Sequence, residues 1–468
     1  MRRIGIVSVS DERPNANAKV KEYINAQLQE LLALLKTIDD VEPVVVEEPA
    51  NSPSAARAAG KYLAAQDVDG IIFNVPTFGF PKFALQIVTY THGPYLLLAK
   101  MDPTQPSPAG IAGVGGALSQ LGIKTERVWM NLDDPRAKKR IEEFINVCAA
   151  VTGLKGSVLG LVGGRSMGLC PMVSSAKQFA RQFGVDVDQV DQLEIIQKSR
   201  NIPKERVDMA LQWLKDNVGS IEFDDILTEE KLREQIKNYE ALKQIIKEKE
   251  FDFTAVKCHY EMSEYEQPMC IAAMLSNDPY DWDGPKKTHV YACEADEDGA
   301  MTMQILKLLS NGKPTCLLDT RYYDEKSNTF LYQNCGIAPS WFACRCDDPK
   351  KNLGCVKLCS CVPKFRGGGA QGTFWFAPGE YTLARLYQIE DTYHMLILRG
   401  NTVSQKDVPD MPTGEGHWPK IAMKIDTTPD VVADKLNSVH MHAVSGNYVN
   451  ELKMICKYLN IVPEVIAQ

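Results

Sequence analysis

The feature that most constrains the fold is a repeated alternation of short apolar segments with amphipathic helical segments. In the first part of the chain, the expected strands cover residues 2–10, 41–47, 68–76 and 92–103. Between the first two, residues 20–35 place Ile24, Leu28 and Leu31 at helical spacing. Short buried strands that alternate with helices form parallel sheets covered on both faces. The pattern predicts a doubly wound α/β domain at residues 1–155.

The same alternation restarts at residue 156 and predicts a second α/β domain at 156–310. Its expected elements are the strand-and-loop segments at 156–168, 251–262 and 288–296, with helices at 207–217 and 227–250. From about residue 365 the chain becomes rich in Gly, aromatic and β-branched residues, which is typical of antiparallel strands. We therefore expect a mainly antiparallel, β-barrel-like C-terminal domain at 311–468, closed by a helix at 447–461.

Charge and apolar patterning exclude several classes of protein. The formal net charge of −8 argues against nucleic acid as a partner, because phosphate binding needs a basic surface. No apolar run approaches the roughly 20 residues of a membrane span, and too few residues precede Asp11 for a signal peptide. We expect a cytoplasmic protein with no membrane partner.

Thirteen cysteines in a chain of 468 residues are too few for a disulfide framework. Five of them cluster at Cys344, Cys346, Cys355, Cys359 and Cys361. Structural zinc sites usually pair cysteines as C-x2-C, and none of these spacings matches. Reduced thiols in and around strands are the preferred interpretation.

Acidic residues crowd the end of the apolar segment 290–293. Glu294, Asp296, Glu297 and Asp298 occupy four of five positions. Capping of the following helix explains the last three, but not Glu294 at the strand tip. A further strand at 313–319 ends in Asp319, so the segment looks like a β-α-β unit. If both strands are parallel neighbours about 4.8 Å apart, both carboxylates emerge at one edge and can hold one cation.

A third ligand for such a cation has few candidates, since the chain has seven histidines. His440 and His442 form an H-x-H pair whose imidazoles share one side if the segment is extended. The spacing does not choose between them. Two carboxylates with one imidazole suit a hard divalent ion such as Mn²⁺ or Mg²⁺ better than structural zinc.

These residues lie in segments that resemble the L-fucose isomerase family, with L-arabinose isomerases as more distant relatives. The matching segments are "GGRSMG" (163–168), "VDMALQWLKDN" (207–217), "FDFTAVKCHYEM" (251–262), "CEADEDGAMTMQILKLLS" (293–310), "TFWFAPGEYTLARL" (373–386) and "HMHAVSGNYVNELKMICKYLNI" (440–461). The resemblance implies a divalent metal, Mn²⁺ before others, on Glu294, Asp319 and His440. It further implies sugar contacts from Arg13, His259, Trp418 and His442. The second metal-binding histidine of arabinose isomerases has Asn334 as its nearest counterpart, which favours the fucose-type ligand set.

The activity implied by the resemblance is an aldose–ketose isomerisation, in which a proton moves between C1 and C2 through an ene-diol. Glu294 would be the base and Asp319 would manage the hydroxyl proton, with no organic cofactor. The resemblance also implies a homo-oligomer, a trimer or hexamer.

The alternatives are an L-arabinose-type isomerase, a metal-dependent epimerase or lyase on a modified sugar, and a sugar-binding protein without catalysis. The two clustered acids count against the last, because sugar binding alone does not need them.

Overall fold

The computed structural model describes residues 1–362, 364–408, 411 and 418–466. The chain forms two compact units. Unit 1 contains Met1–Gly153 and the segment Lys453–Leu459, and unit 2 contains Leu154–Leu452 and Asn460–Gln468. The expected domain boundaries at residues 155 and 310 stay predictions.

Unit 1 is built on a five-stranded parallel sheet with the strand order β2-β1-β3-β4-β5. The strands are β1 (Arg2–Ser8), β2 (Val41–Val45), β3 (Gly70–Asn74), β4 (Tyr95–Ala99) and β5 (Thr125–Trp129). The helices are α1 (Pro14–Leu35), α2 (Pro53–Ala65), α3 (Pro81–Val88), α4 (Ser107–Gln120) and α5 (Pro135–Leu154). Proline begins α1, α2, α3 and α5, because its fixed φ and missing N–H cost nothing at that position.

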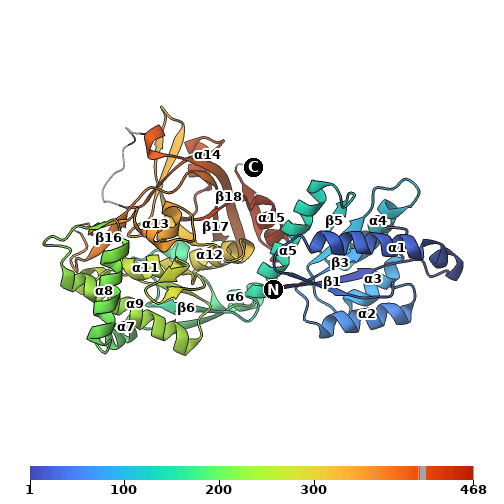
Figure 1. The fold of residues 1–468 in the computed structure, drawn as a ribbon, viewed down its shortest axis with the longest axis horizontal. Coiled ribbons are helices and arrows are strands. Elements are labelled where there is room, and N and C mark those ends of the chain that lie inside the picture. The colour runs from blue at the N-terminus through green and yellow to red at the C-terminus, as the bar shows by residue number, and fades with distance from the viewer. Residues whose placement is uncertain (363, 409–410, 412–417, 467–468) are drawn as a thin grey trace. The chain divides into compact units, whose positions relative to one another are not determined.

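Helices cover both faces of this sheet. One core packs α2, α3 and α4 against the sheet, and the other packs α1 and α5 against the opposite face; Figure 1 shows α1 and α5 on one side, with α2 and α3 on the other. The continuous burial of β3 and β4 reflects this two-sided cover. The doubly wound fold expected for the first domain is confirmed.

Unit 2 opens with a second parallel sheet, of four strands in the order β12-β9-β6-β7. The strands are β6 (Val158–Val162), β7 (Asp186–Val190), β9 (Phe253–Val256) and β12 (Tyr291–Cys293). The helices that accompany it are α6 (Ala176–Phe183), α7 (Gln192–Ser199), α8 (Lys204–Asn217), α9 (Glu229–Lys249), α10 (Glu261–Tyr265), α11 (Cys270–Asn277) and α12 (Glu297–Leu309).

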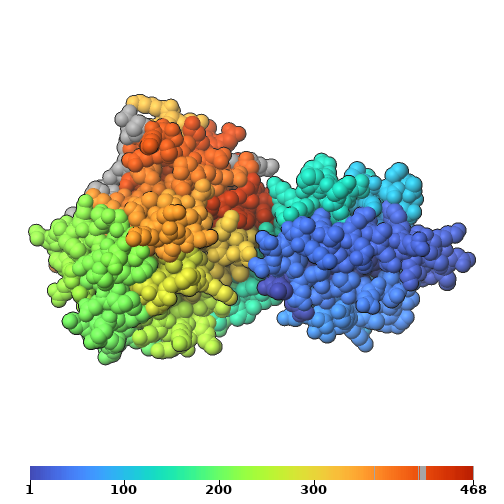
Figure 2. All heavy atoms as spheres, in the orientation of Figure 1, coloured from blue at the N-terminus to red at the C-terminus, as the bar shows by residue number. Residues whose placement is uncertain are grey.

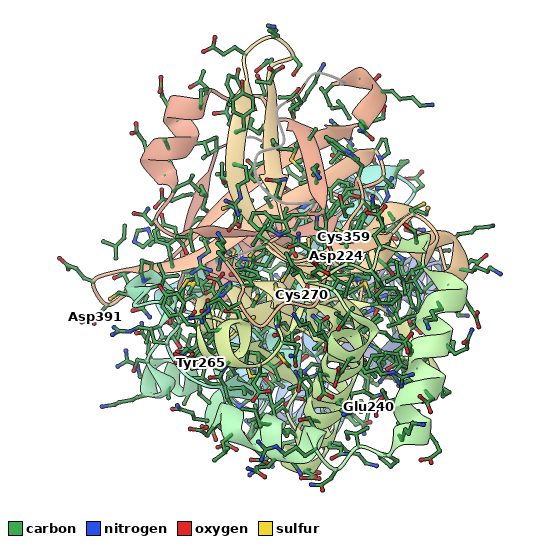
Figure 3. The ribbon with its side chains drawn as sticks, turned by 90° about the vertical axis from the view of Figure 1, so that its left-hand side faces the viewer. Asp224, Glu240, Tyr265, Cys270, Cys359 and Asp391 are labelled. Atoms are coloured by element: carbon green, nitrogen blue, oxygen red, sulfur yellow. The ribbon has the colours of Figure 1, made fainter. Side chains whose placement is uncertain are left out.

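The helices of this sheet differ in how far they are buried. Figure 2 shows residues around 200–220, which include α8, at the surface of unit 2 in green. Figure 3 labels Tyr265 at the end of α10, which is 81% exposed, and Cys270 at the start of α11, which is buried. α11 and α12 pack inside the unit, and nearly all of their side chains are buried.

The later part of unit 2 is a mainly antiparallel sheet of seven strands in the order β17-β20-β13-β14-β19-β18-β21. Its strands are β13 (Thr315–Asp324), β14 (Thr329–Gln333), β17 (Gly379–Ile389), β18 (Thr392–Val403), β19 (Lys420–Lys424), β20 (His440–Ser445) and β21 (Val462–Val465). Because β17 also pairs with β18, six of these strands close into a ring. The expected β-barrel-like region is confirmed.

Smaller elements complete unit 2. They are the strands β8 (Ser220–Ile221), β10 (Tyr280–Asp281), β11 (Gly284–Pro285), β15 (Lys357–Ser360) and β16 (Ala370–Thr373), with the helices α13 (Pro349–Leu353) and α14 (Pro429–Lys435). The last helix, α15 (Val449–Tyr458), lies within the expected range 447–461, and its C-terminal part belongs to unit 1. Among the described residues, no helix combines the length and the apolar character that a membrane crossing needs.

One topological prediction was wrong. β12 and β13 flank α12 but do not form a β-α-β unit, because β12 is the edge of the parallel sheet and β13 pairs antiparallel with β14 and β20. The rule for crossover connections applies only when both strands return to the same sheet. A strand-helix-strand pattern looks the same when the second strand enters a neighbouring sheet.

Candidate active site

A cavity of about 410 Å³ lies in unit 2, between the end of the parallel sheet and the barrel. Its lining residues include Glu294, Asp319, His440 and His259, which carry groups that can bind a metal or move a proton. Its other lining residues are Met167, Leu169, Tyr260, Glu264, Arg321, Cys335, Lys364, Phe365, Trp418 and Val439. The segments that form it span Met167 to His440, so the fold assembles the site from distant parts of the chain.

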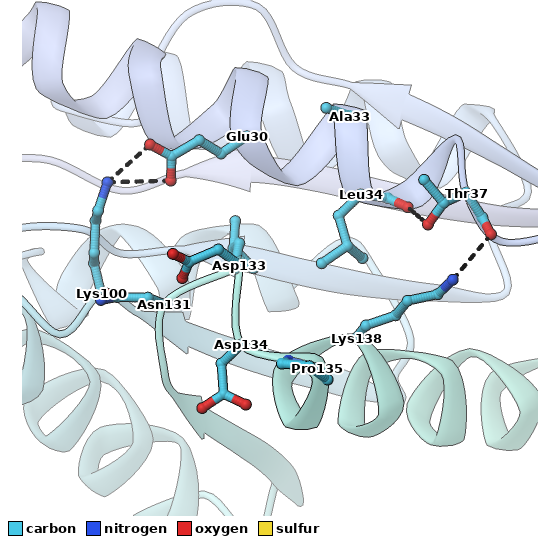
Figure 4. A pocket seen from close by; sticks show the side chains of 11 residues that line it. Glu30, Ala33, Leu34, Thr37, Lys100, Asn131, Asp133, Asp134, Pro135 and Lys138 are labelled. Atoms are coloured by element: carbon cyan, nitrogen blue, oxygen red, sulfur yellow. Dashed lines mark hydrogen bonds and ion pairs between the residues drawn. The ribbon is translucent and has the colours of Figure 1, made fainter.

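Unit 1 holds a larger cavity, of about 720 Å³, shown in Figure 4. It lies between α1 and the start of α5, and its two lysines are already bonded. Lys100 donates to Glu30, and Lys138 donates to the carbonyl of Thr37. None of the residues expected at the site lines this cavity, so its greater size does not make it the better candidate.

Glu294 reaches the cavity in unit 2 through a tight turn after β12. Glu294 and Ala295 both adopt left-handed backbone conformations, with φ of 62° and 53°, which is uncommon for residues other than glycine. Asp296 then becomes the N-cap of α12 and accepts the Gly299 N–H at 2.8 Å. Capping thus accounts for Asp296, as the sequence suggested, while Glu294 is left as a buried carboxylate that lines the cavity.

Asp319 and His440 are brought together by the barrel. They stand directly opposite each other on the antiparallel strands β13 and β20. His440 Nε2 lies 3.7 Å from Asp319 Oδ1 and 3.6 Å from Glu294 Oε2. The expected convergence of these three residues is therefore present in the geometry, although through two different sheets instead of one.

The hydrogen bond at Nδ1, the other ring nitrogen of His440, determines the orientation of the ring. Nδ1 lies 2.8 Å from Asp296 Oδ2, and an ionised carboxylate can only accept, so Nδ1 carries the hydrogen. In the neutral ring, which is the form that binds a metal, Nε2 is then the unprotonated nitrogen, and it faces Glu294 and Asp319. A carboxylate behind a histidine in this way is the usual support of a metal-binding imidazole. The sequence predicted a cap at Asp296 but gave no sign of this second contact.

Burial and neighbouring charges shift the pKa values of these groups. Burial raises the pKa of Glu294, and the charges of Asp319 and Asp296 add to that shift. Burial alone would lower the pKa of His440, but the hydrogen bond and charge of Asp296 raise it above its ordinary value. Burial would raise the pKa of Asp296, yet the fully buried Arg385 and the bond from His440 hold it well below its usual range.

His259 and Cys335 extend the site on the other side of Glu294. His259 follows β9, the parallel neighbour of β12, and its Nε2 lies 3.7 Å from Glu294 Oε1. Cys335 follows β14, and the ligand atoms of His259, Glu294 and Cys335 all lie within 4.8 Å of one another. The neighbouring Asn334, which the sequence suggested as the counterpart of a metal ligand, donates to the Leu317 carbonyl instead. A cysteine directly after a strand beside that of Asp319 was the available signal.

The remaining predicted contacts are placed differently. Trp418 lines the cavity, and its Nε1 donates to Gln371. His442 is fully buried and is not one of the lining residues; its Nε2 lies 4.0 Å from Asp296 Oδ2. Arg13 lies in unit 1, before α1, and pairs with Asp11. Sugar contacts by these three residues stay predictions.

Comparison with known proteins gives two domain matches and several relatives. The domain models described as L-fucose isomerase, first N-terminal domain, and L-fucose isomerase, C-terminal domain, match residues 1–156 and 332–465. Sulfoquinovose isomerases from Priestia aryabhattai and Priestia megaterium are 21% identical over 422 residues, which cover 86% of this chain and 86% of theirs. A sulfoquinovose isomerase from Alkalicoccus urumqiensis is 20% identical over 399 residues, which cover 84% of this chain and 85% of its own.

The two domain models together match more than half of the chain. The second range includes His440 and Trp418, while Glu294 and Asp319 lie between the two ranges. The fold agrees, since the first range forms a doubly wound domain and the second covers most of the barrel strands. The chain belongs to the L-fucose isomerase family.

Proposed function

We propose that this protein is a metal-dependent aldose–ketose isomerase that moves a proton between C1 and C2 of a sugar through an ene-diol. The isomerase class follows from the family and from the names of the relatives. The observation that carries the metal dependence is the convergence of two carboxylates on Nε2 of His440. We further propose a cytoplasmic homo-oligomer, a trimer or hexamer, whose mass sedimentation analysis would measure.

The donor atoms fit a divalent cation. Glu294 Oε2 and Asp319 Oδ1 lie 3.6 and 3.7 Å from His440 Nε2, too far for a hydrogen bond. Ligand atoms about 2.1 Å from one ion lie roughly 3 to 4 Å apart, so these separations suit ligands that surround a cation. Two oxygens and one imidazole favour Mn²⁺ or Mg²⁺. When bound to Glu294, Asp319 and His440, such an ion polarises sugar oxygens and stabilises developing negative charge.

The proton transfers are assigned to the two carboxylates. Glu294 takes the carbon-bound proton, because burial raises its pKa toward the working range of a general base. Asp319 manages the hydroxyl proton, and Arg321 Nη2 holds its other oxygen at 2.5 Å. Acid–base catalysis of this kind contributes about 10² to 10⁴ in rate. Trp418 covers part of the pocket and helps to exclude water.

The deciding experiment tests a panel of aldoses and ketoses with added Mn²⁺ on the unaltered protein and on Glu294→Gln. We expect isomerisation that falls by at least about 10²-fold in the variant, with an unchanged melting temperature. Glu222→Gln is the matched control, because Glu222 is exposed and, among the residues that the structure describes, forms an ion pair with Lys357 alone. Activity that survives Glu294→Gln, or that survives exhaustive chelation, would refute the proposal.

Solvent deuterium separates the alternatives. An ene-diol pathway exchanges deuterium into the product as the carbonyl moves. Deuterium exchange without movement of the carbonyl would identify an epimerase instead. Binding of sugars without either change would leave only a sugar-binding protein.

Two cations at the pocket favour a sugar with an anionic group as the substrate. Arg321 lies over the Trp418 ring at 4.7 Å, and Lys364 lies 5.9 Å from the same ring. Arg321 is already paired with Asp319, whereas Lys364 forms no ion pair among the residues that the structure describes. The relatives are named for a sulfonated sugar. We propose that Lys364 pairs with a sulfonate or similar anion.

Lys364→Gln tests this assignment. We expect KM for a sulfonated hexose to rise by about tenfold, the loss of roughly 1.4 kcal/mol for a charge-assisted contact, while KM for the neutral hexose does not change. Lys326→Gln, at an exposed lysine in the turn between β13 and β14, is the control. An equal change for both sugars would refute a role in anion recognition.

A further inference from the structure

The two oxygens of Glu294 face two different histidines. Oε2 lies 3.6 Å from His440 Nε2, on the side of the proposed Mn²⁺ ligands. Oε1 lies 3.7 Å from His259 Nε2, on the side of Cys335. The second side combines a nitrogen of His259, an oxygen of Glu294 and the sulfur of Cys335. Glu294 is the residue that the two sides share.

The hydrogen bonds around His259 decide which of its nitrogens carries the hydrogen. Ser263 Oγ donates its single hydrogen to the Tyr260 carbonyl at 3.0 Å. The contact of 2.9 Å between His259 Nδ1 and Ser263 Oγ must therefore have Nδ1 as its donor. Nε2 is left unprotonated and faces Glu294 Oε1, which is also an acceptor. Nε2 and Oε1 are both hydrogen-bond acceptors, so neither can donate to the other, and a cation between them would bind to both.

We propose that His259 Nε2, Glu294 Oε1 and Cys335 Sγ form a second cation site, which binds a thiophilic divalent ion of the Zn²⁺ class. Tetrahedral zinc with bonds of about 2.0 to 2.3 Å holds its ligand atoms roughly 3.3 to 3.6 Å apart. His259 and Glu294 are already at 3.7 Å, and all three atoms lie within 4.8 Å. Side-chain movements of about 1 Å complete the set.

The donor set selects the ion. A thiolate favours zinc and similar ions, whereas Mn²⁺ and Mg²⁺ favour oxygen ligands. On binding, the Cys335 thiol releases one proton to solvent and its sulfur forms a bond to the ion, with no change of oxidation state. Ser263 behind His259 supplies the outer hydrogen bond that orients a ligating imidazole.

Occupation of this site draws Glu294 away from His440. Zn²⁺ there therefore competes with the Mn²⁺-supported reaction, an expectation that rests on the proposed function. Binding itself does not rest on it, because the sulfur ligand gives a spectroscopic signal that is independent of activity.

Co²⁺ in place of Zn²⁺ gives the direct test, because a cobalt–thiolate bond produces a charge-transfer band in the near ultraviolet. All proteins carry Cys344→Ser and Cys355→Ser, since those exposed thiols lie 3.4 Å apart and could bind the ion themselves. We expect one thiolate band per chain, which Zn²⁺ removes. Cys335→Ser should abolish the band, and Cys170→Ser, at an exposed cysteine, should leave it intact.

Affinity gives the second measure. Cys335→Ser and His259→Gln should each weaken Zn²⁺ binding by at least about tenfold, the lower bound for losing even an outer partner of a metal ligand. A band that is missing in the background protein, or one that persists in Cys335→Ser, would overturn the proposal.

A measurement on the unaltered chain covers the case in which a variant does not fold. Zn²⁺ should slow the alkylation of Cys335 by iodoacetamide, as mapped on peptides, while Mg²⁺ should not, and Cys170 serves as the internal reference. Equal alkylation of Cys335 with and without Zn²⁺ would refute the site. If Zn²⁺ does not protect Cys335 but Mn²⁺-dependent isomerisation is intact, only the second cation site is refuted. If the thiolate band appears but no sugar is isomerised, only the proposed function is refuted.

Discussion

The ion pair between Asp296 and Arg385 provides the sharpest test of how the site is supported. Both side chains are essentially buried, with 0% and 1% of their surfaces exposed. Asp296 Oδ2 accepts from Arg385 Nη1 at 2.5 Å and from His440 Nδ1 at 2.8 Å. The same carboxylate caps α12, so one residue joins the helix, the barrel and the candidate metal ligand.

The magnitude follows from the burial. Removing one partner of a buried pair leaves an uncompensated charge, which costs about 3 to 5 kcal/mol. Asp296→Asn should lower the free energy of unfolding by that amount, because within the described part of the chain the Pro171 carbonyl is then the one hydrogen-bond acceptor left to Arg385. Arg385→Met should cost a similar amount. The double variant leaves neither charge buried, so it should be more stable than the sum of the two losses predicts, by about 2 kcal/mol or more.

The assay is equilibrium urea unfolding followed by circular dichroism, with the denaturant slope checked for each variant. Glu222→Gln and Lys357→Met form the control cycle, because that pair is exposed and should couple by less than about 1 kcal/mol. In the double variant of the buried pair, Mn²⁺ should bind about 10- to 100-fold more weakly, since His440 loses its carboxylate support. Single losses below about 1 kcal/mol, or additive losses, would refute the reasoning.

Three further predictions concern the pH dependence of stability, the substitution of two glycines and the removal of the metal. Burial lowers the pKa of His289 to about 3. Between that pH and about 6.5, the unfolded state therefore binds more protons than the folded state. The free energy of unfolding should fall as the pH falls through this range, by up to about 1.4 kcal/mol per pH unit. His289→Gln should flatten the dependence of the melting temperature on pH over this range, and an unchanged slope would refute the assignment. Gly299→Ala should destabilise the protein by more than about 2 kcal/mol, because a Cβ there would lie 2.6 Å from Asp296 and 2.7 Å from His442. Gly116→Ala, in open space on α4, should stabilise it by up to about 1 kcal/mol, and calorimetry that ranks the two variants equally would contradict the packing argument. Dialysis against a chelator should abolish activity and added Mn²⁺ should restore it, whereas activity that persists without metal would exclude the proposed ligand roles.

One property of the site could be predicted from a single segment. The acids after β12 were recognised because three of them suit a helix start and Glu294 does not. Helix capping depends on a few neighbouring residues, so a local rule describes it.

The Cys344–Cys361 region shows the limit of spacing arguments. The expectation of free thiols in and around strands agrees with the structure, in which all described cysteines are free and Cys359, labelled in Figure 3, lies in β15. The spacing did not indicate that Cys344 and Cys355 would lie 3.4 Å apart. That contact depends on how the helix α13 between them folds.

The sequence by itself determined the kinds of element and their order, because hydrophobic periodicity reports how each segment buries its own apolar side. It therefore predicted the parallel sheet of unit 1, the later barrel and the position of Glu294 at a strand tip. Only the tertiary structure decided which sheet β13 joins, that Asp319 stands opposite His440, and that Asp296 and Cys335 reach the same site. Those outcomes depend on contacts between segments that are far apart in the sequence, for which a local pattern carries no register.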